Sequence, residues 1–374
     1  MHKIRAAHPE EGLSLSKHAS KDPSRRHFAC AQWLLRMSGE TDIGGGRRGA
    51  HHREEGAALL AVLLLVAVMA AISVMAMEKL TLATHLAING QAIDQARAYA
   101  VGAESLAALR IGELAGRERN KTTLAGNWNG RTVGVPVPGG VMRLKLRDGG
   151  NCFNLNSVAE GLQPTELRAR PAGVAQFVAL MKIVGVGEPA ARRVAASLAD
   201  WIDGDRVPAP EGAEDLDYGR ASTPYRAANT LLAEPSELRA VAGVTSEIYA
   251  LLRPWVCTLP STELSPINVN TIGEAQAPLL MMLIPDQLDR ERARQIIVAR
   301  PPEGWDDLDS FWKLPSLAAL VPMMEVRDQP QLRTRWFALD LDVELAGAQV
   351  TETALIDGGL SPARVVLRRW GSDE

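Results

Sequence analysis

Residues 57–77 read AALLAVLLLVAVMAAISVMAM, and this stretch decides the fold. None of these residues is charged, and Ser73 is the only polar one. A helix rises by ~1.5 Å per residue, so a helix of this length covers roughly 30 Å, about the hydrocarbon thickness of a bilayer. The sequence therefore predicts a membrane-spanning helix over 57–77.

The helical pattern continues beyond the apolar stretch. Between residues 78 and 114 apolar side chains recur at helical spacing, with polar residues between them, at Leu82, Leu86, Ala92, Ile93, Ala96 and Ala100. This spacing is typical of an amphipathic helix. We expect one long helix from about 57 to about 114, lipid-like in its first half and amphipathic in its second. The alternative is a simple membrane anchor followed by a coiled stalk.

The charges before the apolar stretch set its expected orientation. Arg47, Arg48 and Arg53 precede it, and such a cluster favours an N-terminus on the cytoplasmic side. The apolar core is too long for a signal peptide and flows into a helix, so cleavage by signal peptidase is not expected. Residues 78–374 would then lie outside the cytoplasm.

The composition limits the classes of function. The chain has 374 residues, 41 Lys and Arg, 44 Asp and Glu and a net charge of -3. This length predicts two or three compact units, and the balance of charge argues against a dedicated nucleic-acid binder. Six of the seven histidines precede residue 56, which leaves only His85. If the N-terminal stretch is removed, catalysis by histidine and a histidine-rich metal site are therefore not expected.

Strand patterns flank a long helical block. Alternating apolar and polar residues predict strands over 141–147, 337–345, 351–356 and 363–370, whereas helical patterns dominate between 164 and 332. A hairpin alone is only marginally stable, so the two strand groups most simply form one sheet. We expect an α+β fold in which this small antiparallel sheet packs on the long helix and the helical block is an insertion.

Two cysteines could form a bridge. Cys30 lies in the N-terminal stretch, which leaves Cys152 and Cys257, 105 positions apart. A protein exposed to the periplasm can oxidise such a pair, and a loop that long gives a bridge worth on the order of 4 kcal/mol in the chain-entropy model. The alternative is two buried free thiols.

The acidic stretch 198–219, LADWIDGDRVPAPEGAEDLDYG, is the most distinctive motif. Its hard oxygen donors around Gly and Pro turns suit Ca²⁺. Asp203 and Asp205 have the spacing of the first EF-hand ligands, but the later Gly and the closing Glu are missing. A solvated acidic loop is the alternative. Paired carboxylates also occur in glycoside hydrolases, but nothing around them resembles a sugar cleft.

Residues 181–198, MKIVGVGEPAARRVAASL, have the shape of a helix-hairpin-helix, and residues 267–300 resemble the same unit without its glycine pair. In DNA-binding hairpins the backbone N–H groups contact phosphate. Residues 57–374 contain 31 Lys and Arg against 37 Asp and Glu, so binding driven by counterion release would be weak. We interpret the hairpin as a packing module and keep a DNA-uptake pilus component as the alternative function.

The junction before the apolar stretch resembles the processing site of type IV pilins and pseudopilins. Gly56 ends a polar leader and Ala57 begins the apolar helix, the pattern cut by prepilin peptidase. The leader of 56 residues is longer than usual in that class, so the true start could be Met37 or later. Position five after the cut is Ala61, where most members carry Glu.

An ordered set of motifs makes the resemblance more specific. CFNLNSV, LADWIDGD, EDLDY, PYRAAN, SELRAV, VCTLP and INVNT follow the pilin-like helix in this order, between residues 152 and 271. The chain thereby resembles the protein K family of minor pseudopilins of type II secretion, over roughly residues 45 to 370. That family also lacks the Glu at position five, as at Ala61.

The resemblance implies a structural role, so we expect that the chain is not an enzyme. It implies a subunit that caps the tip of the periplasmic pseudopilus with minor pseudopilins I and J, and also H, and helps initiate the fibre that exports folded proteins across the outer membrane. It implies processing by prepilin peptidase, methylation of the new N-terminus, a single pass through inner-membrane lipid, a periplasmic C-terminal domain and no nucleic-acid partner.

The resemblance also implies residues and boundaries. Family members bind Ca²⁺ in the acidic region, which carries the ligand role to Asp203, Asp205, Glu214, Asp215 and Asp217. The implied fold is pilin-like with a helix-hairpin-helix or SAM-like insertion. The expected segments are a leader at 1–56, a transmembrane half-helix at 57–77, sheet-bearing parts at 78–160 and 335–374, and the inserted helical domain at 161–334.

Overall fold

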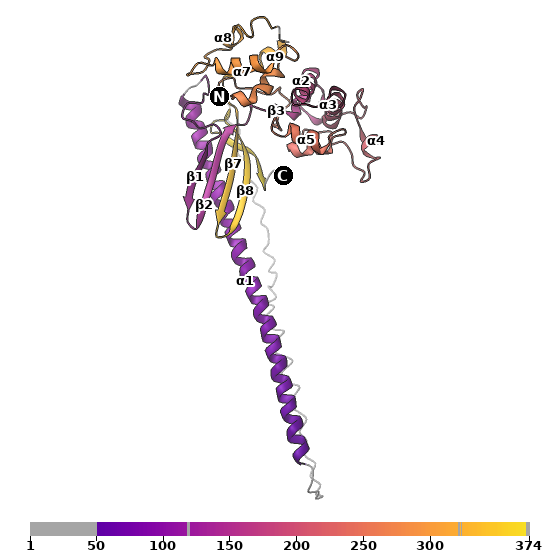
Figure 1. The fold of residues 1–374 in the computed structure, drawn as a ribbon, viewed down its shortest axis with the longest axis vertical. Helices are drawn as coiled ribbons and strands as arrows, with labels where there is room; N and C mark the ends of the chain where they lie inside the picture. The colour runs from indigo at the N-terminus through magenta and orange to yellow at the C-terminus, as the bar shows by residue number, and fades with distance from the viewer. Residues whose placement is uncertain (1–50, 118–119, 321, 323, 372–374) are drawn as a thin grey trace, which may run out of the picture. The chain divides into compact units, whose positions relative to one another are not determined.

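The computed structural model describes residues 51–117, 120–320, 322 and 324–371 (Figure 1). The expected leader up to residue 50 lies outside the described residues. The chain divides into two compact units, residues 1–76 and residues 77–374. The helices, strands and sites described below beyond residue 76 belong to the second unit.

One helix dominates the N-terminal part. α1 runs over His51–Arg117, 67 residues, and confirms the long helix expected from about 57 to about 114. Among the described residues it is the one helix long and apolar enough to cross a membrane, with a mean hydropathy of 2.9 in its most apolar window and none of that window buried. An exposed apolar surface of this length suits lipid as its solvent.

The two predicted strand groups form one antiparallel sheet of five strands. Its order is β1-β2-β7-β8-β9. The strands span Thr132–Val137, Gly140–Asp148, Trp336–Leu345, Ala348–Asp357 and Arg364–Trp370. Cross-strand pairs such as Leu144 with Leu341 join the strand group before the helical block to the group after it. The expected α+β fold, with the helical block inserted between strands of one sheet, is therefore confirmed.

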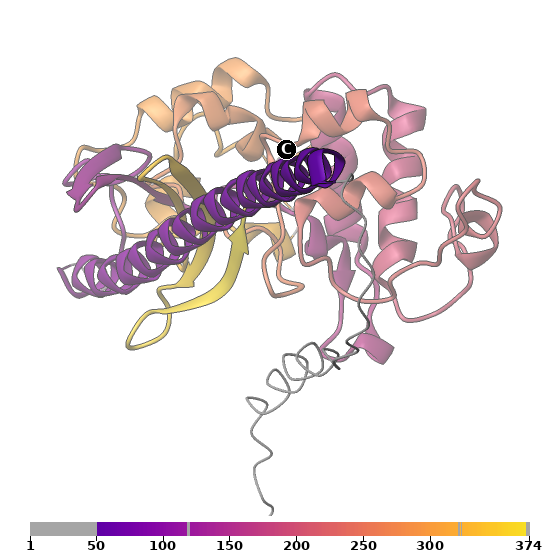
Figure 2. The ribbon, with the colours of Figure 1, turned by 90° about the horizontal axis from the view of Figure 1, so that it is seen from below.

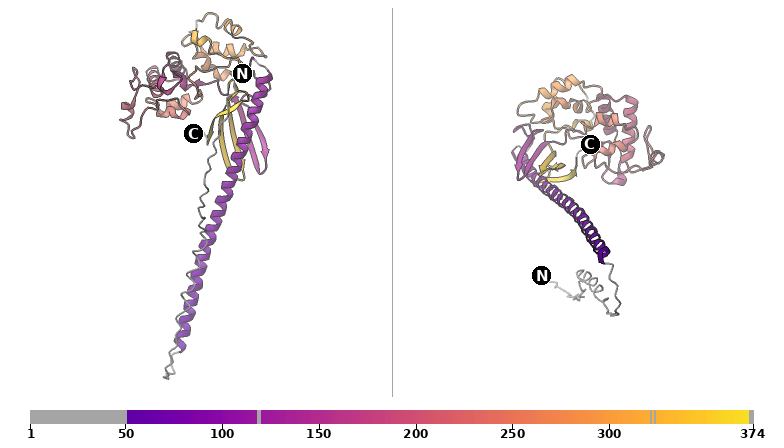
Figure 3. Two further views of the ribbon diagram at one scale, coloured as in Figure 1. Left: turned by 180° about the vertical axis from the view of Figure 1, so that it is seen from behind. Right: turned by 60° about the horizontal axis from the view of Figure 1, so that its bottom comes forward.

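The second half of α1 covers one face of this sheet (Figure 3). Ala96, Ala100 and Ala103 present small side chains from the helix, so its backbone approaches the strands closely. Phe337 and Leu339 are among the strand residues that complete this core, and both are at most 2% exposed. Each large apolar side chain buried in this way contributes about 1.5–3 kcal/mol to the free energy of folding.

The inserted segment is helical and has its own core. Figure 2 shows its helices as two neighbouring groups, α2 and α3 in pink and α6 to α8 in orange. Phe177, Leu198, Leu280 and Phe311 belong to one continuous cluster of buried side chains that joins the groups. The helices are α2 Pro171–Ile183, α3 Glu188–Ile202, α4 Asp215–Tyr218, α5 Ser246–Leu252, α6 Ala277–Met281, α7 Arg290–Val298, α8 Leu308–Trp312 and α9 Met324–Arg327.

Short elements connect the helices. Two small strand pairs lie outside the main sheet: β3 Phe153–Asn154 beside β6 Val256–Cys257, and β4 Ala159–Glu160 beside β5 Arg168–Ala169. The 3₁₀ turns are η2 Leu155–Val158, η3 Pro164–Glu166, η4 Pro235–Ala240 and η5 Glu274–Gln276.

One expected helical stretch is wrong. Residues 165–170, TELRAR, have a helical pattern, but the structure forms a 3₁₀ turn followed by the strand β5. Pro171 begins α2, and the residue before a proline is restricted to extended backbone. Arg170 accordingly has φ -98° and ψ 112°. The helix could therefore begin only at the proline.

A buried carboxyl joins the end of β2 to the inserted segment. Asp148 is 7% exposed and accepts hydrogen bonds from the hydroxyl of Thr271 (2.6 Å), the hydroxyl of Thr334 and the backbone N–H of Gly150. Burial raises the pKa of Asp148 against the lowering effect of these donors. The contacts attach Thr271 and Thr334, both more than 120 positions away along the chain, to the end of β2.

Candidate functional site

The acidic stretch is held in place by aromatic side chains at the end of α3. Trp201 packs against Tyr218 and Tyr225, with ring centroids 5.1 Å and 6.1 Å from its own. Tyr218 is 3% exposed, and its hydroxyl accepts a hydrogen bond from the backbone of Ala242. Both ends of the acidic loop are therefore attached to a packed core.

Three of the five predicted ligands come together. Carboxylate oxygens of Asp203, Asp205 and Glu214 all lie within 4.8 Å of one another. Asp203 and Glu214 are 5% and 3% exposed, whereas Asp205 is exposed. In the described part of the chain, Asp203 Oδ1 and Glu214 Oε1 are buried and accept no hydrogen bond. Two buried acceptors without donors beside a third carboxylate are what a cation site requires.

The electrostatics of this cluster are unfavourable without a cation. Burial, together with the neighbouring carboxylates, raises the pKa of Asp203 to about 6 and that of Glu214 to about 7. Asp200 lies beside them, and burial raises its pKa to about 6. Desolvation and like charges both penalise the ionised forms. Hard oxygen ligands of this kind suit Ca²⁺ or Mg²⁺ rather than a soft metal.

The other two predicted ligands have different partners. Asp215 Oδ1 accepts a hydrogen bond from the backbone N–H of Ala227 at 3.1 Å. Asp217 Oδ2 accepts one from the backbone N–H of Glu214 at 3.2 Å, as part of the capping box at the start of α4. Neither residue belongs to the group of converging carboxylates among the described residues.

Two further oxygen-bearing residues border the cluster and were not predicted as ligands. Asp200 Oδ1 and Oδ2 accept the backbone N–H of Ala209 at 3.2 Å and 3.1 Å. Asn229 donates from its side chain to the carbonyl of Asp205 at 3.1 Å, and its Oδ1 is buried without a donor in the described part of the chain. Asn229 closes the PYRAAN motif, whose position beside the acidic loop was the available signal.

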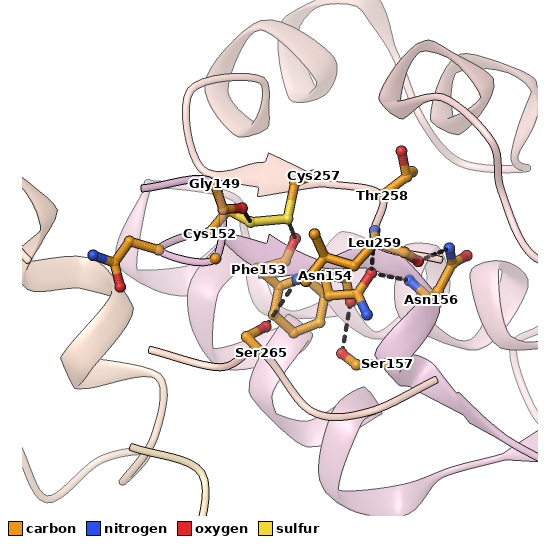
Figure 4. The surroundings of a disulfide bond; sticks show 12 residues. Gly149, Cys152, Phe153, Asn154, Asn156, Ser157, Cys257, Thr258, Leu259 and Ser265 are labelled. Carbon is orange, nitrogen blue, oxygen red and sulfur yellow. Dashed lines mark hydrogen bonds between the residues drawn. A yellow bond between two sulfur atoms is a disulfide. The ribbon is translucent and has the colours of Figure 1, made fainter. Parts of the chain in front are cut away.

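Cys152 and Cys257 form a disulfide in the structure, with their Cα atoms 5.8 Å apart (Figure 4). The bridge lies beside the parallel pair of β3 and β6. Around it, the side chain of Asn154 accepts the backbone N–H of Asn156 and of Leu259. The CFNLNS and VCTLP motifs are thus two sides of one buried polar network.

The predicted helix-hairpin-helix consists of α2, the turn around Gly185 and α3. Gly185 has φ +102°, a conformation that favours glycine. The cations near the turn have carboxylate neighbours: Lys182 Nζ lies 3.8 Å from Glu188 and 3.5 Å from Asp286, and Arg192 pairs with Glu188. This charge arrangement favours packing over contact with phosphate.

The predicted processing and filament residues lie in the first part of α1. Gly56 and Ala57 are both within the helix, and Ala57 and Ala61 are exposed. An alanine at position 61 offers no carboxylate there. No described contact of these residues bears on cleavage.

Comparisons with known proteins identify the family. Residues 151–261 and 267–331 match two family models described as "Type II secretion system (T2SS), protein K". The protein K of Pectobacterium carotovorum is 33% identical over 309 residues, which cover 82% of this chain and 93% of that protein. The protein K of Aeromonas hydrophila is 32% identical over 311 residues, which cover 81% of this chain and 93% of that protein.

A solved structure has the same fold. The chain is similar to one in the crystal structure of the GspK-GspI-GspJ complex from the type 2 secretion system of enterotoxigenic Escherichia coli, with a TM-score of 0.66 and 32% identity over 76% of this chain and 98% of that one. The residues that the family models match, 151–261 and 267–331, make up most of the helical insertion. The chain belongs to the type II secretion system protein K family of minor pseudopilins.

Proposed function

We propose that this minor pseudopilin caps the tip of the type II pseudopilus and helps initiate its assembly for the export of folded proteins across the outer membrane. The observation that carries the proposal is the combination of a pilin-like helix and sheet with a helical insertion in a protein K family member. The role is structural rather than enzymatic.

Two features support a place at the tip rather than in the shaft. Ala61 lacks the carboxylate that, in most pseudopilins, neutralises the N-terminal amine of a neighbouring subunit. The insertion contributes eight helices, α2 to α9, among the described residues, and such bulk would obstruct a repeating shaft. A subunit with both features suits a position that occurs once per filament.

Minor pseudopilins I and J, with H, are the proposed partners. Support comes from the related complex of GspK with GspI and GspJ and from α1 itself. Val101, Leu106 and Leu109 are 39%, 65% and 66% exposed and lie on the part of α1 that follows the apolar stretch. Apolar side chains at helical spacing suit packing against the helices of other subunits.

The N-terminal part fits membrane insertion and processing. The apolar half of α1 is consistent with a single pass through the inner membrane. We propose that prepilin peptidase cuts between Gly56 and Ala57, that the new amine is methylated, and that residues 78–374 lie in the periplasm.

Calcium is the proposed cofactor. The three converging carboxylates, with two buried oxygens that lack donors, fit a divalent cation. Asp203, Asp205 and Glu214 are the proposed ligands, and Asn229 supplies a further oxygen beside them. Bound Ca²⁺ would neutralise the carboxylates and fix the loop to the end of α3.

The experiment that tests the role replaces Gly56 by Ala in the source bacterium. We expect the variant to keep its leader, because a side chain at this position blocks the cut, and the secreted proteins to accumulate in the periplasm. Intact mass of the envelope form and activity of exoproteins in the medium are the readouts. Gly46→Ala, in the same leader, is the control. Normal secretion by an unprocessed variant would contradict the proposal.

A further inference from the structure

The face of the sheet opposite α1 carries a row of polar side chains. Lys145 on β2 pairs across the strands with Asp340 on β7, Asp340 with Thr353 on β8, and Thr353 with Arg369 on β9. Side chains alternate between the two faces of a strand, and their neighbours Leu144, Leu146 and Leu339 belong to the core under α1. The row therefore faces away from α1.

This row forms one wall of a cleft of about 580 Å³. The opposite wall comes from the inserted segment and includes Arg253, Thr258 and the disulfide between Cys152 and Cys257. A volume of this size lies within the range of roughly 300–1,000 Å³ that is typical of ligand sites. The cleft thus lies between one face of the sheet and the inserted segment.

The lining of the cleft is more basic than the chain as a whole. Lys145, Arg147, Arg253 and Arg369 line it, against the carboxyls of Asp340 and Asp148. Arg147 forms two hydrogen bonds with Asp340, at 3.0 Å and 3.2 Å. Asp148 is buried, as described above. The whole chain, by contrast, has a net charge of -3.

The cations that line the cleft differ in whether a carboxylate of the chain already pairs with them. Arg369 Nε lies 3.7 Å from Glu234 just outside the cleft, and its Nη2 donates long hydrogen bonds of 3.5 Å to the carbonyl of Ala233 and the hydroxyl of Thr258. Arg147 is paired as described. Within the described residues Lys145 has no ion pair, because its cross-strand neighbour Asp340 pairs with Arg147 instead. Lys145 is half-buried at the cleft wall, so it is the cation best placed to bind an external carboxylate.

The spacing of the cations indicates the kind of ligand. Lys145 and Arg369 stand three strand intervals apart, about 14 Å at roughly 4.8 Å per interval. One phosphate or sulfate cannot contact both. Two carboxylates four residues apart on an extended chain, which advances by about 3.3 Å per residue, span that distance.

We propose that this cleft binds an extended acidic segment of another protein, with one carboxylate on Lys145 and a second, about four residues away, on Arg369. Thr353, which lies between them in the row, offers a neutral hydroxyl to the peptide backbone. This inference goes beyond the proposed function, which requires no ligand in this cleft.

The test uses the full chain purified in a nonionic detergent and a fluorescein-labelled peptide, GSEGSGEGS, followed by fluorescence anisotropy. We expect saturable binding that weakens with salt and is lost when both Glu are replaced by Gln. Lys145→Gln should weaken binding about fivefold or more, as expected for one close charge pair. The control Arg143→Gln, on the same strand and face but outside the cleft, should change it less than twofold.

Any one of four outcomes would overturn the proposal. One is equal binding of the Glu and Gln peptides, and another is unchanged affinity of the Lys145→Gln protein at an unchanged melting temperature. The third is equal affinity for a peptide with its two Glu adjacent, and the fourth is full displacement of the peptide by millimolar sulfate. Either of these two results would indicate a site for a single anion. An unchanged melting temperature also separates loss of binding from loss of folding.

Discussion

At the scale of single residues, two buried glutamates share one arginine between α1 and the sheet. Glu104 and Glu352 are 3% and 2% exposed. Arg368 pairs with Glu104 and lies 3.5 Å from Glu352. Burial, together with the neighbouring Glu104, raises the pKa of Glu352 to about 8. Burial also opposes ionisation of Glu104, but its hydrogen bonds with Arg368 and Glu352 lower its pKa overall.

This pair predicts a loss of stability as pH rises. In the unfolded chain Glu352 loses its proton near pH 4.5, whereas in the folded chain it keeps the proton until about pH 8. Between pH 4.5 and about pH 8 the folded state therefore binds more protons than the unfolded state. The free energy of unfolding falls as the pH rises through this range. Glu352→Gln should remove this component and stabilise the protein at pH 8, on the order of 1–2 kcal/mol after allowance for the shared charge.

Melting temperatures from pH 5 to pH 8.5 measure the effect. The difference in melting temperature between Glu352→Gln and the parent should grow with pH and then level off. Glu303→Gln, at an exposed position, is the control and should run parallel to the parent. A pH-independent difference for Glu352→Gln would count against a protonated Glu352.

Calcium binding is a second prediction at the scale of residues. Millimolar Ca²⁺ should raise the melting temperature relative to EGTA, because a ligand at 100 times its dissociation constant stabilises the folded state by about 2.7 kcal/mol. Glu214→Gln should abolish the response. Asp217→Asn should keep it, since Asp217 caps α4 and lies outside the converging group. Identical melts of the parent in Ca²⁺ and EGTA would refute the site.

At the scale of elements, the sequence predicted α1, α3 and the strands β2, β7, β8 and β9 well. α3 begins at Glu188 with Pro189 in its first turn and ends at Ile202, as the amphipathic pattern EPAARRVAASLADWI indicates. Local patterns suffice here because the apolar residues of each element face one buried surface. The helical prediction for residues 165–170 was wrong because Pro171, which follows the stretch, restricts the backbone before it to an extended conformation.

The acidic loop could be predicted only in part. Its density of carboxylates is a local property, but which of them converge depends on the turn between α3 and α4 and on α4 itself. Asp215 begins α4 and Asp217 lies in its first turn, so their oxygens accept hydrogen bonds from backbone N–H groups. Asn229 reaches the loop from residues beyond α4, a contact that no local pattern indicates.

The contact of α2 with η2 gives a prediction at the scale of elements. A Cβ atom at Gly173 would lie 1.9 Å from the carbonyl oxygen of Ser157. Gly173→Ala should therefore force the helix away from the buried turn and destabilise the protein by about 2–3 kcal/mol, as other steric conflicts in a core do. Chemical denaturation measures this free energy.

A helical glycine elsewhere provides the matched control. Gly112 lies inside α1, and a Cβ there would meet nothing within 4 Å. Gly112→Ala should be neutral or stabilising by up to ~1 kcal/mol, because alanine favours helix. Equal effects of the two substitutions would show that the close contact at Gly173 does not constrain the fold.

At the scale of the whole molecule, one pilin-like fold carries a second core. The sheet and α1 supply the features of a filament subunit, and the inserted helices supply bulk, the acidic loop and one wall of the basic cleft. The contacts of Asp148 with Thr271 and Thr334 link the end of β2 to the inserted segment.

We propose that this chain forms a tip complex with minor pseudopilins I and J. Native mass spectrometry of the three full-length proteins, coexpressed from the source organism and purified in detergent, tests it most directly. We expect one species with a single copy of each protein, since a tip subunit occurs once. A mass that contains several copies of this chain, or this chain without either partner, would contradict it.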